Sequence, residues 1–331
     1  MTEPHRPVFN RVEAVEAGVA SSPGQVAEIT RGRYDGGPAD TTRFIDMNPS
    51  GGLHLRILVD RGFDIGPAWF RSDQIAWLSK VGPTASLDRV TEFRHRDRFS
   101  GGLVTTCGLD NVGAPSEGIG LHGTIGQVKA GNVTTECVPN GSEWDLVARA
   151  TVDDVTSLAR HLRLERAITT STGRAAVTIS DAVTNLGTAT EPAPILYHVN
   201  IGYPVWQPGA IVEIASREAR VRDDVTPASV PPGSWASAPD PGPNAAEIVH
   251  EHLGLTNGSA AVVNRAVDMR VDVTWDIGEL PRLYQWTHPA TTVYALGIEP
   301  FTHRSRPADD EHRRTDLRHR GGDPRRLRSG R

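Results

Sequence analysis

The chain has 331 residues, with 35 Lys and Arg against 40 Asp and Glu, and a formal net charge of −5 at pH 7. Its positive side chains are scattered through the body of the chain and form no basic stripe, which argues against a nucleic-acid partner. No window of about 18 consecutive apolar residues exists, so we expect neither a transmembrane helix nor a membrane partner.

The composition favours many short strands in a single domain. Hydrophobic residues make up 38% of the chain, with 33 Gly and 24 Pro, which suits strands joined by turns better than long helices. Cys107 and Cys137 show no CxxC spacing, and the N-terminus lacks the apolar run of a signal peptide. The expected compartment is therefore a reducing cytoplasm.

Period-two alternation of apolar and polar residues recurs in the middle of the chain. Residues 146–152, 162–168 and 175–180 all show it, which predicts half-buried strands. Residues 169–174 are rich in Ser, Thr and Gly and are typical of a hairpin turn, and residues 185–187 predict the next turn. Successive antiparallel strands with short turns favour an all-β sandwich or barrel over βαβ units.

Two later strands each place one titratable group on an otherwise apolar surface. In residues 195–202, alternation puts His198 on the same face as Asn200. In residues 293–299, Glu299 shares its face with Ala295 and Gly297, so small neighbours leave space beneath the carboxylate. A flat ligand could lie in that space.

Residues 227–243 contain six prolines and cannot form a central strand. They predict a long exposed loop, which either rims a binding site or is a surface excursion without function. Between this loop and Glu299, Gln285 and Trp286 point to opposite faces of a predicted strand. One of them should face the ligand, and the other should lie in the core.

Residues 304–331 differ from the rest of the chain, because they hold ten Arg against five acidic residues and almost no large apolar side chain. Such a segment cannot bury enough surface to offset the entropy lost on ordering, so disorder is expected. It is either a basic tail or, as we favour, the out-of-frame end of a GC-rich coding sequence. The predicted domain is then residues 1–303.

His122, His198 and Glu299 together could move protons at neutral pH. Each has a plain structural alternative: His122 lies between glycines and could be a turn residue, His198 could bond a neighbouring carbonyl, and Glu299 could end a strand in solvent. His and Glu can also ligate zinc, but no HxxxH or HxH spacing is identified, so no metal site is predicted. A GxSxG nucleophile motif is absent as well.

Six segments, in this order and spacing, carry a family resemblance: residues 59–66, 101–113, 120–123, 197–204, 285–286 and 296–300. On these residues the chain resembles the aldose 1-epimerase-like family, and most closely an uncharacterised branch labelled as a domain of unknown function. The resemblance implies a galactose mutarotase-like β-sandwich, a supersandwich of antiparallel strands with a carbohydrate cleft on one sheet. It also implies a small-molecule sugar as partner and no cofactor.

The resemblance further implies roles for three residues. His198 would be the general acid that protonates the ring oxygen, and Glu299 the base that takes the proton of the anomeric hydroxyl, with the two on opposite sides of the ring. His122 would help to hold the ring oxygen. Family members continue for several segments beyond His303, including a closing strand, and without that strand the sheet edge carrying Glu299 would be unpaired.

Further polar residues in these segments are candidate sugar ligands. Asp60, Arg61 and Asp64 could bind hydroxyls or could form an ion-paired turn, and Asp110 and Asn111 carry the same two alternatives. The sequence therefore offers seven substrate-binding candidates: Asp60, Arg61, Asp64, Asp110, Asn111, Asn200 and Gln285.

Two functions therefore follow from the sequence. The first is a cofactor-independent isomerase that interconverts sugar anomers. The second is a carbohydrate-binding module or sensor that uses the same cleft without turnover. A ring-spanning distance between His198 and Glu299 would favour the enzyme. The sequence specifies neither the sugar nor the oligomeric state.

Overall fold

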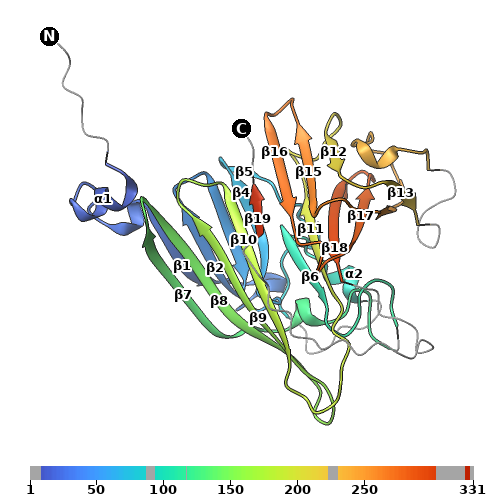
Figure 1. Ribbon diagram of the computed structural model, residues 1–331, viewed down its shortest axis with the longest axis horizontal. Coiled ribbons are helices and arrows are strands. Elements are labelled where there is room, and N and C mark those ends of the chain that lie inside the picture. The colour runs from blue at the N-terminus through green and yellow to red at the C-terminus, as the bar shows by residue number, and fades with distance from the viewer. Residues whose placement is uncertain (1–8, 87–93, 117, 223–229, 303–324, 329–331) are drawn as a thin grey trace.

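A computed structural model of the chain describes residues 9–86, 94–116, 118–222, 230–302 and 325–328. Two antiparallel sheets pack face to face, which confirms the predicted all-β sandwich (Figure 1). The larger sheet has the strand order β1 (Ala27–Arg33), β2 (Arg43–Pro49), β3 (Leu53–Leu58), β4 (Asp64–Phe70), β6 (Val104–Gly108), β11 (Ile195–Ile201), β18 (Ala295–Phe301), β17 (Arg282–His288), β14 (Ile248–Leu253) and β13 (Glu218–Val221), with β5 (Asp73–Gln74) paired to β4.

The smaller sheet covers the inner face of the larger one, with β7 (Gly131–Asn140), β8 (Glu143–Val155) and β9 (His161–Ser171) packed against β1 and β2. Helices are few and short in the part of the chain that the structure describes. The smaller sheet has the order β12 (Ile211–Ile214), β15 (Ser259–Asn264), β16 (Met269–Thr274), β19 (Arg325–Arg328), β10 (Ala176–Asn185), β9 (His161–Ser171), β8 (Glu143–Val155) and β7 (Gly131–Asn140); the helical segments are α1 (Arg11–Glu16), α2 (Arg94–Arg98) and the 3-10 turns η1 (Pro23–Gln25), η2 (Gly37–Ala39), η3 (Ile125–Gln127) and η4 (Ser234–Ala236).

The three strands predicted from alternation correspond to β8, β9 and β10. The first predicted turn lies where β9 leads into β10, and the second lies at the end of β10. The proline-rich segment contains no strand in its described part, residues 230–243, as its composition predicts. In β9, every second residue from Leu162 to Ile168 is buried, so the alternation seen in the sequence is the alternation between core and solvent.

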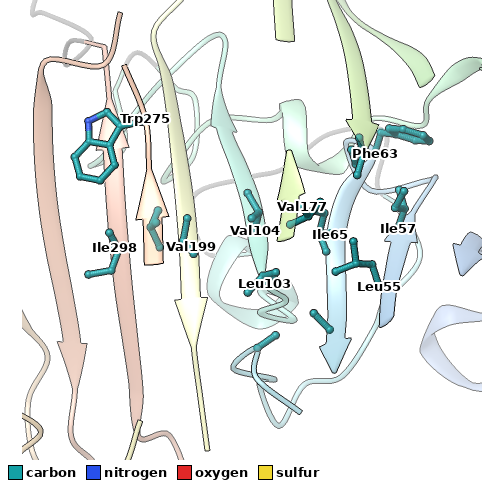
Figure 2. Close-up of a cluster of buried hydrophobic side chains, with 14 of the residues drawn as sticks. Leu55, Ile57, Phe63, Ile65, Leu103, Val104, Val177, Val199, Trp275 and Ile298 are labelled. Carbon is teal, nitrogen blue, oxygen red and sulfur yellow. The ribbon is translucent and has the colours of Figure 1, made fainter. Parts of the chain in front are cut away.

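The apolar core lies between the two sheets. Figure 2 shows part of it, with Ile65, Val104, Val199 and Ile298 from neighbouring strands of the larger sheet pointing the same way, and Val177 of the smaller sheet close to them. Each of these side chains is at most 4% exposed. Side chains alternate along a strand. The residues that flank these core residues in sequence therefore point to the outer face of the larger sheet.

One ion-pair network crosses this core. The Arg166 side chain on β9 is fully buried and donates to Asp64 Oδ1 at 2.7 Å and to both oxygens of Asp181 at 2.9 and 2.7 Å. It also donates to Thr106 Oγ1 at 2.8 Å, and Tyr197 donates its hydroxyl to Asp181 at 2.6 Å. Strands of both sheets are therefore joined by charge as well as by apolar contacts.

Two expectations about the C-terminal part of the chain need correction. The sheet edge carrying Glu299 is not unpaired, since β18 lies inside the larger sheet between β11 and β17. Disorder is wrong for residues 325–328, which form β19 in the gap between β10 and β16, where both neighbours offer backbone partners. Residues 304–324 and 329–331 lie outside the described residues, so for them disorder stays a prediction.

Candidate active site

A cavity of about 930 Å³ opens on the outer face of the larger sheet. Its floor comes from β11, β18, β17 and β14, and its walls come from the segments around residues 77–81, 96–99, 113–122 and 292–293. The side chains that matter for chemistry are His122, His198 and Glu299, the aromatic residues Trp77, Phe99, Tyr284 and Trp286, and the further ionisable residues Lys80, Arg96, Arg222, Glu247 and His288.

His198 and Glu299 meet on the floor of this cavity. The antiparallel register pairs Val199 with Ile298, so the preceding residue on β11 lies opposite the following residue on β18, on the other face. Nε2 of His198 is 3.2 Å from Oε1 of Glu299, and the two side chains are only 5% and 6% exposed. The structure thus brings together two of the three predicted catalytic residues, which lie about 100 positions apart in sequence.

The predicted placement of this pair on opposite sides of a sugar ring is wrong. A separation of 3.2 Å leaves no room for a ring between them, because neighbouring strands lie only about 4.8 Å apart. The chemistry does not require a wider spacing. The ring oxygen and the anomeric hydroxyl of a cyclic sugar are bonded to the same carbon, so an acid and a base that lie side by side can face both.

Gly297 makes room for the pair, as the sequence indicated. A Cβ atom at this position would lie 2.7 Å from Cε1 of His198 and 3.0 Å from Oε1 of Glu299. Both distances are too short for a normal contact, so any larger residue would push the imidazole or the carboxyl away. The need for glycine here comes from space, not from backbone conformation.

Burial raises the pKa of the Glu299 carboxyl from its ordinary value of 4.5 to about 8. The positive charge of Arg222 opposes this rise, and the negative charge of Glu247 adds to it. At pH 7 the carboxyl therefore favours its protonated form. Such a shift places the group in the pH range where a side chain can both give and take a proton.

His122 reaches the same cavity from a loop. Its backbone is left-handed, with φ of 64°, and its ring lies edge-on to the His198 ring at a centroid distance of 5.9 Å. The loop is held by main-chain bonds from His122 N to Gly113 O and from Gly108 N to His122 O, each 2.9 Å. All three predicted catalytic residues therefore line one cavity.

Asp110 and Asn111 shape that loop and are not among the residues that line the cavity, so the structure does not bring them to His198 and Glu299, and their binding of sugar stays a prediction. Asp110 accepts hydrogen bonds from the backbone and hydroxyl of Thr124 at 2.9 and 2.7 Å. The amide of Asn111, 1% exposed, donates to the carbonyls of Ala114 and Gly120 at 2.8 and 3.1 Å. These bonds use the polar atoms that a sugar would need.

Asp60, Arg61 and Asp64 also lie away from the cavity, and the ion-paired alternative describes them better. Asp60 pairs with Arg43, whose Nε is 2.9 Å from Oδ1. Asp64 belongs to the Arg166 network, and burial raises its pKa despite that partner.

Arg61 has a different structural role. Its guanidinium donates to the carbonyls of Gly126, Thr84 and Arg98 at 3.2, 3.0 and 3.2 Å, and so ties three segments together. Burial lowers its pKa to about 10. A guanidinium engaged in this way acts as a structural link between these segments, and Arg61 is not among the residues that line the cavity.

Asn200 and Gln285 are buried side chains that do not line the cavity either. The amide of Asn200 donates to Gly102 O and His198 O, both at 2.9 Å, and so holds β11 in place beside His198. Gln285 pairs with Ile298 in the sheet and therefore points to the inner face, where it donates to Trp235 O at 2.8 Å. Trp286, the alternative left open by the sequence, is the one that faces the cavity.

Aromatic rings surround His198. Phe99 and Trp286 lie edge-on to its ring at centroid distances of 5.3 and 5.5 Å, and Trp77 lies 5.8 Å from Trp286. The sequence analysis missed Trp77 and Phe99, because loop residues carry no periodic pattern. Trp286 could have been assigned to the cavity only from the strand register, which pairs it with Gly297 on the outer face that also carries Glu299.

A histidine pair also escaped the sequence analysis. His250 and His252 have the HxH spacing and lie on β14, facing the core, where His252 Nε2 is 3.2 Å from Gln285 Oε1. Burial lowers the pKa of both imidazoles, to about 4 for His252. Within the described part of the chain, no group of three or more His, Cys, Asp or Glu side chains is placed to hold a metal ion.

Comparison with known proteins places this sandwich in a family. The model of a domain of unknown function, DUF4432, matches residues 39–320, so the chain belongs to that family. The fold is the galactose mutarotase-like β-sandwich, as shown by its likeness to solved structures. No curated protein matches the chain, and no helix among the described residues is long and apolar enough to span a membrane.

Three of those structures show how far the likeness extends. A presumed aldose 1-epimerase from Klebsiella pneumoniae superposes with a TM-score of 0.71 at 21% identity, over 84% of this chain and 79% of the other. A galactose mutarotase-like protein from Clostridium acetobutylicum gives 0.60 at 12% identity, over 92% and 98%. A presumed aldose 1-epimerase from Escherichia coli K12 gives 0.53 at 16%, over 85% and 96%.

Proposed function

We propose that this protein binds a reducing sugar in the 930 Å³ cavity and interconverts its anomers by acid–base catalysis. The observation that carries the proposal is the contact between His198 and Glu299 on the cavity floor. An imidazole and a carboxyl within hydrogen-bonding distance form a pair that can hold one proton and exchange it between two sites. The names of the similar structures agree with this chemistry.

The proposed reaction needs only the two side chains and the sugar, because every proton that one gives up another takes. Nε2 of His198 donates a proton to the ring oxygen while the Glu299 carboxylate takes the proton of the anomeric hydroxyl. The bond between the anomeric carbon and the ring oxygen breaks, and an aldehyde forms. After rotation about the adjacent C–C bond, both proton transfers run in reverse and the ring closes as the other anomer.

The surrounding side chains would orient the ring. His122 lies beside His198 and is proposed to help to hold the ring oxygen. Trp286 and Phe99 offer flat apolar surfaces that suit the C–H face of a sugar. A sugar held in this way presents its anomeric carbon to both members of the pair, which is the main requirement for a reaction of this kind.

A second candidate is sugar binding without turnover. The raised pKa of Glu299 favours this alternative near pH 7, because a protonated carboxyl cannot take the anomeric proton. The two candidates then differ in their response to pH. An enzyme should show a bell-shaped dependence of activity on pH, because only the form of the pair that holds one proton is reactive, whereas a binding protein shows no activity at any pH.

The partner that we propose is a small-molecule sugar, and we propose no nucleic-acid or membrane partner. We also place the protein in a reducing cytoplasm and in carbohydrate metabolism. Cys107 and Cys137 are both free thiols, which agrees with that compartment.

Polarimetry on freshly dissolved reducing sugars tests the proposal. The full-length protein should accelerate the approach to anomeric equilibrium, with a maximum of activity between pH 5 and pH 9. Calorimetry on the same sugars reports binding separately. Binding without acceleration at any pH in this range would establish the second candidate, and neither binding nor acceleration would exclude both.

A further inference from the structure

A second hollow, of about 430 Å³, lies on the outer face of the larger sheet and shares no lining residue with the 930 Å³ cavity. His54 on β3 pairs with Trp69 on β4, and their neighbours Leu55 and Ala68 lie in the core, so the two rings point outward. β4 and β18 are three strand spacings apart, about 14 Å across the sheet, so the hollow lies apart from the site at Glu299. Its lining residues are Asn48, Gly52, Leu53, His54, Trp69, Arg71 and Ser72.

An aromatic surface forms one wall of this hollow. The ring centroids of His54 and Trp69 are 4.8 Å apart and the ring planes are inclined by 32°, so the two rings stack in part. The side chain of His54 is 37% exposed, and Trp69 is half-buried. A half-buried indole in a hollow offers a flat apolar surface and suits a ligand that has an apolar face of its own.

Polar side chains surround the aromatic surface. Asn48, Arg71 and Ser72 are all exposed and line the same hollow. The amide of Asn48 and the hydroxyl of Ser72 can each donate and accept hydrogen bonds, and the guanidinium of Arg71 adds several donors. A hydroxyl group of a ligand also both donates and accepts, so this set of side chains suits a ligand rich in hydroxyl groups.

Arg71 is held in place although its side chain is exposed. Its backbone N–H donates to Gly52 O at 2.7 Å, and its guanidinium lies over the Phe70 ring, 4.9 Å from the centroid. A Cβ atom at Gly52 would lie 3.5 Å from Cγ of Arg71, so the arginine stem packs closely over this glycine. A guanidinium positioned in this way loses less conformational freedom when it binds a ligand.

The turn that carries Arg71 and Ser72 has an unfavourable backbone. Phe70 pairs with Asp73, so the two residues between them form a two-residue hairpin turn, in which φ is 51° at Arg71 and 75° at Ser72. Such turns favour Asn and Gly, because other residues are disfavoured at positive φ. Strain of this kind is concentrated at segments that bind ligands, which supports a binding role for the two side chains.

We propose that this hollow is a second carbohydrate-binding site, in which one sugar unit packs its C–H face on the aromatic surface of His54 and Trp69. Asn48, Arg71 and Ser72 then bind its hydroxyl groups. The volume of about 430 Å³ lies within the range of small-molecule pockets. This site does not use His198 or Glu299, so the inference is independent of the proposed interconversion of anomers.

Fluorine NMR of the full-length protein labelled with fluorotryptophan tests this inference. The chain has seven tryptophans, and the signals of Trp69 and Trp286 are assigned by their loss in Trp69→Phe and Trp286→Phe. The probes are the methyl glycosides of glucose and galactose, and maltotriose. We expect at least one probe to shift the Trp69 signal in a saturable manner. A Trp69 signal that moves with none of them would overturn the inference.

The Trp286 signal reports on the cavity separately. A response of Trp69 without any response of Trp286 would support the second site and count against sugar binding in the cavity. A response of Trp286 alone would do the reverse. The two proposals can therefore fail independently.

Two substitutions of exposed side chains test the polar contacts. Asn48→Ala and Arg71→Ala should each raise the sugar concentration that half-saturates the Trp69 shift by about threefold or more, because each removes hydrogen bonds to the sugar. Arg265→Ala is the matched control, since Arg265 is exposed in the turn between β15 and β16, outside the hollow, and it should behave as wild type. Unchanged half-saturation in both test variants would show that the sugar only touches the ring, and would overturn the inference.

Discussion

Glu299 lies in an environment unlike that of an ordinary glutamate, because its carboxyl is buried and not exposed to water. Its side chain is 6% exposed and lies on a sheet surface next to a glycine, an imidazole and an aromatic ring. Alternation along each of the two strands was enough to predict that His198 and Glu299 each have small or polar neighbours on their own face. Their direct contact was not predictable, because the register between two strands far apart in sequence is set by the whole sheet.

The raised pKa of Glu299 predicts a pH dependence of stability. Between pH 4.5 and about 8 the folded protein keeps a proton that the unfolded chain has lost. The free energy of unfolding contributed by this group therefore falls as pH rises through this range. Glu299→Gln removes the group, so its free energy of unfolding relative to wild type should increase from pH 5 to pH 8.

Urea unfolding at several pH values measures this difference. Glu165→Gln, at an exposed position on β9, is the control and should run parallel to wild type. A constant difference between Glu299→Gln and wild type across this pH range would show that the carboxyl titrates normally.

At the scale of elements, the site depends on how β11 and β18 approach each other. Gly297 permits this approach, and the sequence predicted open space at this position but not what fills it. The register between β11 and β18 determines what fills this space. It places the imidazole and the carboxyl beside the α-carbon of Gly297. The same register decides that Trp286 faces the cavity and Gln285 the core, a choice that the pattern alone left open.

Gly297→Ala should separate His198 from Glu299, the proposed catalytic pair, without unfolding the sheet. The added methyl group would meet His198 and Glu299 at 2.7 and 3.0 Å, so one of them must move. We expect a loss of activity on the order of tenfold to hundredfold, because small displacements of a reacting group have large effects. A crystal structure of the variant should show a longer distance from Nε2 to Oε1.

Gly131→Ala is the control for this substitution. Gly131 begins β7 in the smaller sheet, and the nearest atom to an added Cβ there is 3.8 Å away. It should retain full activity. Wild-type activity in Gly297→Ala would mean that the pair tolerates displacement and that its close contact is not needed.

At the scale of the whole molecule, the sandwich was predictable from composition and alternation, and the Arg166 network was not. In β9 the pattern predicts the buried positions correctly, but it gives no reason for an arginine among them. The reason lies in distant residues, since Asp64 and Asp181 come from two other strands and reach Arg166 only in the folded sandwich. The predicted sugar ligand Asp64 turned out to serve this network instead.

Arg166→Met should therefore destabilise the protein strongly. It would leave two buried carboxylates without their partner, and breaking a buried pair in this way typically costs about 3 to 5 kcal/mol. Urea denaturation measures the loss. Arg163→Met removes a half-exposed arginine of the same strand that pairs with Asp153 at 2.7 Å, and it should have a much smaller effect. Equal losses for the two variants would show that the network does not hold the sheets together.

The central claim is that His198 and Glu299 exchange protons with a sugar, and NMR exchange spectroscopy on its anomers tests it most directly. With a sugar that wild type interconverts, Glu299→Gln should lower the exchange rate by about a hundredfold or more, since Gln keeps the shape but cannot take a proton. His198→Asn should act similarly, Glu165→Gln should match wild type, and binding of the sugar should persist in all of them. A Glu299→Gln protein that interconverts anomers as fast as wild type would contradict the account.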